Sequence, residues 1–161
     1  MEEPILNSHN KLEYGPAHSC EHLLNATMVK MFGCPRSRNA HIERKKSKCD
    51  YLLMQEPSQD EVAAIEAKVN EVIGMNLPVT VEYMTQAQAA DIVDLSKLPQ
   101  NATDTLRIVR VGDYDVCACA GDHVQNTSEV APFKIISADF TPAEQEGEPG
   151  RWRVRFKLLE G

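Results

Sequence analysis

The sequence contains no apolar run as long as the roughly 20 residues that a membrane-spanning helix needs. Its N-terminus, Met-Glu-Glu-Pro, is acidic, whereas a secretory signal peptide begins with basic residues and continues into an apolar stretch. Internal repeats and low-complexity segments are also absent, which excludes a repeat array. We therefore expect a cytoplasmic protein that is neither exported nor inserted into a membrane.

The chain lacks a complete set of cysteine pairs, because it has five cysteines and an odd number cannot all form disulfides within one chain. In a chain without an export signal, we expect reduced thiols, some of them metal ligands, rather than a disulfide framework. The cysteines are Cys20, Cys34, Cys49, Cys117 and Cys119.

The composition is otherwise that of an ordinary globular protein, with 42% apolar and 25% charged residues among 161. This length matches one folded unit with a single core. We expect residues 1–161 to form one domain, with its core between about residues 15 and 157.

The chain has no excess of basic residues, since it contains 17 Lys and Arg residues and 24 Asp and Glu residues. Residues 56–104 carry nine acids against two lysines, which equals the whole net charge of −7. The basic residues gather instead in residues 36–48 and 151–157. These two stretches are either solvated faces or patches that contact phosphate groups.

Three segments carry helix signals. Residues 15–33 begin with Gly-Pro and end at a glycine, with apolar residues at helical spacing at Leu23, Leu24, Thr27, Met28 and Met31. A capping box at Ser58 and Glu61 starts a second helix that ends at Gly74, and Thr85 caps a short third one.

Apolar runs predict the strands, and residues 112–113 form a turn between two of them. Together these patterns predict an α+β fold, with an antiparallel or mixed sheet packed against helices. The expected strands are residues 51–54, 79–83, 106–111, 114–117, 133–140 and 151–159.

Two pairs of metal-ligand residues stand out. His18 and His22 are four residues apart on the first helix, so both imidazoles lie on one face. Cys119 and His123 have the same spacing around a glycine, and a set of three histidines and one cysteine suits tetrahedral zinc. The alternative is that the two pairs are unconnected. Four protein ligands are typical of a structural site, whereas catalysis needs an accessible coordination position.

Glu21 lies between the two histidines of the helix and completes the pattern H-x-x-E-H, in which the glutamate is the general base of a metallopeptidase. That is a competing hypothesis. The downstream Cys119 and His123 are not part of the peptidase pattern.

The motif order His18-x-x-x-His22, Cys119-Ala-Gly-Asp-His123-Val and then Asn-Thr and Phe-Lys-Ile-Ile resembles the editing domain of alanyl-tRNA synthetases and of free-standing alanyl-tRNA editing proteins. That domain is related to the editing domain of threonyl-tRNA synthetases. The resemblance extends from about residue 15 to residue 156. It implies an editing-domain fold and hydrolysis of the ester between a wrongly attached amino acid and the terminal ribose of tRNA. The expected substrate is seryl- or glycyl-tRNA-Ala.

The resemblance also implies roles for individual residues. In the family the four motif positions bind zinc, which assigns this role to His18, His22, Cys119 and His123. Where the family commonly has Gly-Gly-Thr, this chain has Ala-Gly-Asp, so a carboxylate stands beside the site. The remaining candidates are Glu21 and Asp122 for catalysis, Thr127 and Lys134 for substrate binding, and Arg44, Lys45, Lys46, Arg151 and Arg153 for contacts with the tRNA acceptor stem.

Only 17 residues precede His18, and we expect a short, free-standing editor that acts on released tRNA and has no aminoacylation domain. A synthetase is a further candidate partner. The alternative from a different functional class is a non-catalytic module that binds tRNA or a synthetase and uses its metal only as a structural element.

Overall fold

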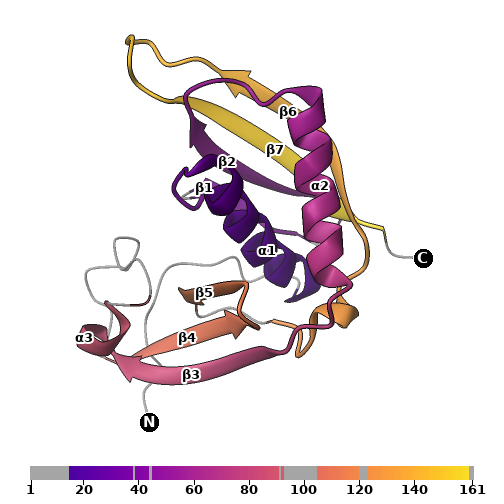
Figure 1. Ribbon diagram of the computed structural model, residues 1–161, viewed down its shortest axis with the longest axis vertical. Coiled ribbons are helices and arrows are strands. Elements are labelled where there is room, and N and C mark those ends of the chain that lie inside the picture. Colours follow the sequence, from indigo (N-terminus) through magenta and orange to yellow (C-terminus); the bar gives the residue numbers. More distant parts are fainter. Residues whose placement is uncertain are drawn as a thin grey trace.

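The computed structural model describes residues 15–37, 39–43, 45–90, 92, 105–119 and 123–159. These residues form two antiparallel sheets and three α-helices, which confirms the predicted α+β class (Figure 1). None of the described helices has the length and apolar character needed to cross a bilayer. The larger sheet has the strand order β1-β2-β7-β6 and the smaller one the order β3-β4-β5. The strands are β1 (Asn39–His41), β2 (Ser47–Leu53), β3 (Val79–Thr85), β4 (Thr105–Val111), β5 (Asp115–Ala118), β6 (Phe133–Thr141) and β7 (Gly150–Leu158).

The helix signals in the sequence are confirmed. Helix α1 (Gly15–Phe32) ends at Gly33, whose φ of +67° is the left-handed conformation that glycine adopts at least cost. Helix α2 (Gln59–Ile73) begins at the Ser58/Glu61 capping box, with both reciprocal hydrogen bonds formed. Helix α3 (Gln86–Ala89) follows the cap at Thr85.

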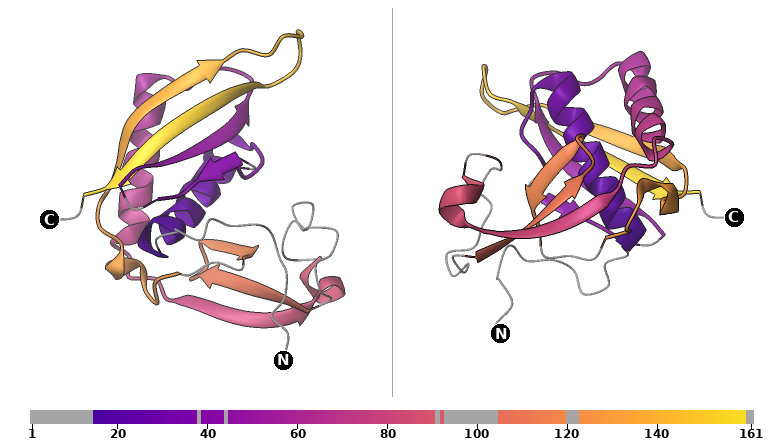
Figure 2. Two further views of the ribbon diagram at one scale, coloured as in Figure 1. Left: turned by 180° about the vertical axis from the view of Figure 1, so that it is seen from behind. Right: turned by 60° about the horizontal axis from the view of Figure 1, so that its bottom comes forward.

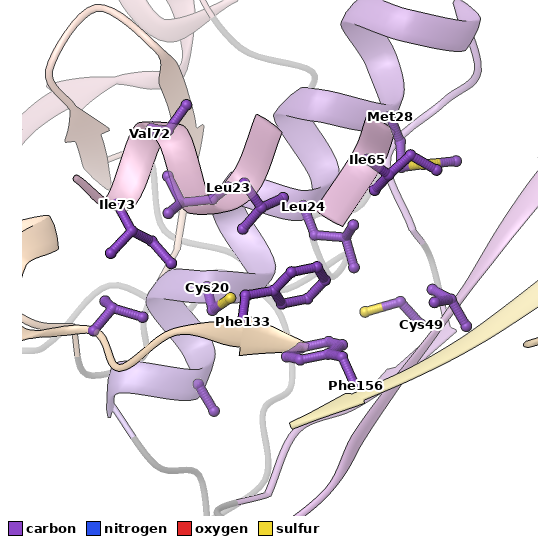
Figure 3. Packing of buried hydrophobic residues seen from close by; sticks show 14 of the residues in the cluster. Cys20, Leu23, Leu24, Met28, Cys49, Ile65, Val72, Ile73, Phe133 and Phe156 are labelled. Atoms are coloured by element: carbon purple, nitrogen blue, oxygen red, sulfur yellow. The ribbon is translucent and has the colours of Figure 1, made fainter. Parts of the chain in front are cut away.

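Helix α1 lies between the two sheets, which all three views show (Figures 1 and 2). Its buried face and the buried face of α2 pack against the larger sheet, where the core contains Leu23, Ile65 and Phe156 (Figure 3). On its other side, α1 contacts β5 of the smaller sheet. A residue on the first two turns of α1 can therefore meet a residue at the end of β5, although about a hundred positions separate them in the sequence.

The structure differs from three local expectations. Met31 was expected on the buried face of α1, but it is 41% exposed because the last turn of the helix extends beyond the core. The basic stretch of residues 36–48, for which no strand was predicted, contains β1 and the start of β2, so β2 begins at Ser47 instead of Tyr51. In β3, Val81 and Tyr83 are 43% and 60% exposed, although apolar residues that alternate along a strand usually face a core.

Candidate metal centre

The two predicted ligand pairs meet in space. His18 Nε2 lies 3.2 Å from Cys119 Sγ, and His123 Nε2 lies 3.5 Å from the same sulfur. The ring centroids of His18 and His123 are 4.1 Å apart, and those of His22 and His123 are 4.4 Å apart. One ligand atom from each of these four residues lies within 4.8 Å of the others, which is close enough for a single ion. The donor set of three imidazoles and one thiol is one that tetrahedral zinc accepts.

Helix α1 positions one half of this cluster, and the β4–β5 hairpin positions the other half. The Tyr114 hydroxyl donates a 2.6 Å hydrogen bond to Thr27 Oγ1, which in turn donates to the Leu23 carbonyl of the helix. The hairpin turns at Gly112, where φ is +51° and an added Cβ would lie 3.0 Å from the Leu77 side chain. A side chain at this turn would therefore press on Leu77, which lies between α2 and β3.

Further hydrogen bonds fix the second ligand pair. The Cys119 carbonyl accepts a 3.0 Å bond from Arg107, and the Cys119 amide donates to the Arg107 carbonyl. Ser19, on α1, has its Oγ 3.0 Å from His123 Nδ1 and accepts a bond from the Val124 amide. Ser19 therefore orients the His123 ring so that Nε2 points to Cys119, which is how residues behind a metal ligand commonly act.

The surroundings of Cys119 and His123 favour the protonation states of metal ligands. Burial by itself would raise the pKa of the Cys119 thiol, but the neighbouring His22 charge and hydrogen bonds from His123 and His18 hold that pKa well below its usual value. Burial, together with the charge of His22, lowers the pKa of His123 to about 3. A thiolate and a neutral imidazole are the forms that coordinate a metal ion.

The second nitrogen of His22 faces a group of residues that sequence reasoning missed. His22 Nδ1 lies 3.2 Å from Asp115 Oδ2 and 3.2 Å from Cys117 Sγ. Asp115 also forms a two-point ion pair with Arg36. Burial by itself would raise the pKa of Asp115, but Arg36 and His22 outweigh it and lower the pKa to about 2.

A sequence signal for part of this group existed. Alternate residues of a strand point to the same face, so the spacing of Asp115 and Cys117 on β5 and of Cys119 just after it could have indicated that they share a face. Cys117 was expected only to be a reduced thiol, and its sulfur contacts His22. Nothing in the sequence indicated that Arg36, counted among the basic residues available for RNA, would turn inward to Asp115.

Of the two residues predicted to be catalytic, the structure describes only Glu21. Glu21 lies beside the cluster, with Oε1 3.7 Å from His18 Nε2 and its side chain 14% exposed. Asp122 lies outside the described residues. Thr127 is buried, donates to the Ile73 carbonyl and accepts a bond from the Leu77 amide. These bonds to backbone groups give Thr127 a structural role between α2 and β3, and no described contact joins it to the cluster.

Arg44 lies outside the described residues, and the other predicted RNA-contact residues lie on the larger sheet and its loops. Lys45 and Lys46 are exposed, as is Lys134 on β6, which was predicted to bind substrate. Arg151 is also exposed on β7, whereas Arg153 makes a two-point ion pair with Asp50. The pairing of β2 with β7 brings the two basic stretches of the sequence together.

This α+β fold, with histidines of one helix facing a cysteine and a histidine after a hairpin, is consistent with the family that the sequence matches. Residues 106–155 match the family described as the threonyl and alanyl tRNA synthetase second additional domain. The chain is therefore related to alanyl-tRNA synthetases through this domain, as its motifs predicted.

Individual relatives support this assignment. The chain is 30% identical to the alanine-tRNA ligase of Leptospira biflexa over 151 residues, which cover 89% of this chain and 15% of that protein. It is 30% identical to the alanine-tRNA ligase of Methanococcus vannielii over 138 residues, or 83% of this chain and 15% of that protein. The enzyme of Bacillus subtilis is 29% identical over 74% of this chain and 14% of its own length. The chain thus corresponds to about 15% of the length of these relatives.

Proposed function

We propose that this protein is a zinc-dependent hydrolase of the cytoplasm that cleaves the ester of mischarged aminoacyl-tRNA, with seryl- or glycyl-tRNA-Ala as the preferred substrate. The observation that carries the proposal is the convergence of His18, His22, Cys119 and His123, the first three of which are buried. The relation to alanine-tRNA ligases supports tRNA as the substrate class. The ligand set favours zinc over harder ions such as Mg²⁺, which prefer oxygen ligands.

The four cluster residues would hold the ion, which would orient a water or ribose hydroxyl and stabilise negative charge developing on the ester. An aminoacyl ester is already activated, so no covalent nucleophile is needed. Glu21 is the acid or base candidate among the described residues, because its carboxylate lies beside His18 and is partly exposed. His123 is the most accessible of the four ligand residues, and we place the substrate on its side of the cluster.

The experiment incubates zinc-loaded protein with seryl-, glycyl- and correctly charged alanyl-tRNA-Ala, each beside buffer alone. We expect faster loss of the two mischarged species than in buffer, with alanyl-tRNA-Ala spared. If every mischarged tRNA survives as long as it does in buffer, the protein is not a deacylase.

The burial of the cluster favours a second candidate function, a non-catalytic module for tRNA or a synthetase that keeps the metal as a structural element. His18, His22 and Cys119 are each 5% exposed or less, as in closed structural sites. Removal of the metal with a chelator separates the two functions. If the ion is catalytic, its removal abolishes turnover and leaves the circular dichroism spectrum unchanged. If the ion is structural, its removal unfolds the protein.

For tRNA binding, we predict that replacement of Arg44, Lys45 and Lys46 by alanine weakens affinity and makes it less dependent on salt. Each lysine or arginine that contacts a phosphate contributes about 1 to the slope of log affinity against log salt concentration. The measurement is a titration of labelled tRNA at several salt concentrations.

Lys68→Ala is the matched control, because Lys68 is exposed but is paired with Glu71 on α2. This variant should keep the slope of the original protein. An unchanged slope in the triple variant would show that residues 44–46 are a solvated surface.

A further inference from the structure

The imidazole of His22 is shared by two groups of ligand-type side chains. One group is the metal cluster, and the other consists of Asp115 and Cys117. An ionised carboxylate only accepts hydrogen bonds, so its position 3.2 Å from Nδ1 requires a proton on that nitrogen. When an ion displaces the second proton of His22, the imidazole that keeps its proton on Nδ1 has its lone pair on Nε2. The contact with Asp115 therefore leaves Nε2 as the nitrogen of His22 that can bind a metal ion.

Arg36 fixes the carboxylate that makes this contact. Its Nη1 lies 2.5 Å from Asp115 Oδ1 and its Nη2 lies 3.1 Å from Oδ2. Two parallel bonds from a planar guanidinium define the plane of the carboxylate as well as its position. The Asp115 side chain is 4% exposed and that of Arg36 is 20% exposed, so water competes little with this pair.

Asp115, Cys117 and His22 have ligand atoms close enough together to hold an ion of their own. Arg36 opposes that use. Its positive charge lies against both oxygens of Asp115 and would repel a divalent cation there. The geometry is instead that of a metal ligand whose second nitrogen is held by a carboxylate.

We propose that Asp115 and Arg36 are positioning residues of the metal centre. Asp115 accepts the Nδ1 proton of His22, Arg36 holds Asp115 in place, and the pair thereby presents His22 Nε2 to the ion. This inference rests on the metal site of the proposed function. It assigns Arg36 to the metal centre, and not to the surface predicted to contact RNA.

The test measures zinc affinity and stoichiometry by competition with a chromophoric chelator. Asp115→Asn leaves one acceptor oxygen where Arg36 and His22 use two. The new amide can also donate to Nδ1 of His22, which favours the tautomer with its proton on Nε2, where it prevents metal binding. We expect zinc affinity to fall about 10–100-fold, with one ion bound per chain in both proteins. Nitrogen-15 NMR of the zinc-loaded protein should show a protonated Nδ1 on His22.

Asp50→Asn is the matched control. Asp50 forms the same kind of two-point pair with Arg153, at 2.7 and 2.9 Å, but on the larger sheet. Its loss should lower stability without changing zinc affinity. Arg36→Lys retains the positive charge but not the two-point bond, and we expect a smaller loss of zinc affinity in a folded protein.

Three results would overturn the inference. They are equal zinc affinities for the Asp115→Asn and Asp50→Asn proteins, binding of two ions of which Asp115→Asn removes one, or no zinc binding by the original protein. If Asp115→Asn weakens zinc binding but the original protein hydrolyses no mischarged tRNA, the proposed function is wrong and the positioning role stands.

Discussion

Cys119→Ala is expected to lower zinc affinity by more than about 100-fold and to abolish hydrolysis of mischarged tRNA. The loss of an outer partner of a ligand typically costs 10–100-fold, and removal of the ligand itself costs more. Cys119 is central to the cluster, because its sulfur lies within 3.5 Å of a nitrogen of both His18 and His123. Zinc content after dialysis, chelator competition and deacylation rates measure the two losses.

Cys34→Ala is the control for this variant. Cys34 is also a buried cysteine, but it lies after the end of α1, where its thiol donates to the Met28 carbonyl. We expect its zinc content and rate to match those of the original protein. A Cys119→Ala protein that retains one tightly bound zinc and full turnover would disprove the assignment of the centre. Loss of zinc without loss of turnover would show that the metal is not catalytic.

Phe156→Ala is expected to lower the free energy of unfolding by about 3–5 kcal/mol, the usual cost of removing a buried aromatic ring. Phe156 lies on β7, is fully buried and packs against Phe133 with ring centroids 5.2 Å apart (Figure 3). The side chain lies between the sheet and the helices, so the cavity would weaken both layers. This is a large part of the 5–15 kcal/mol that stabilises a typical domain. Urea denaturation followed by circular dichroism measures the change.

Tyr83→Ala is the matched aromatic control, because Tyr83 is 60% exposed on the edge strand β3. Its stability should change by no more than about 0.5 kcal/mol. Equal losses for the two variants would mean that the core does not lie between the larger sheet and the helices.

The predicted fold followed from local physical rules. The capping box at Ser58 and Glu61 and the glycine at residue 33 define helix ends because they satisfy backbone groups within a few residues. Strand β1 and the early start of β2 were missed, because residues 39–48 are mostly polar. Strand β1 pairs with β2, and β2 in turn pairs with β7, about a hundred residues away.

The sequence by itself determined the two ligand pairs, because a spacing of four on a helix brings His18 and His22 to one face whatever surrounds them. It also carried the motifs of the family. Only the tertiary structure decided that Cys119 lies against His18, and that Arg36 and Asp115 lie behind His22. Spacing rules act over a few residues, whereas contacts across about eighty to a hundred residues depend on how α1 packs between the two sheets.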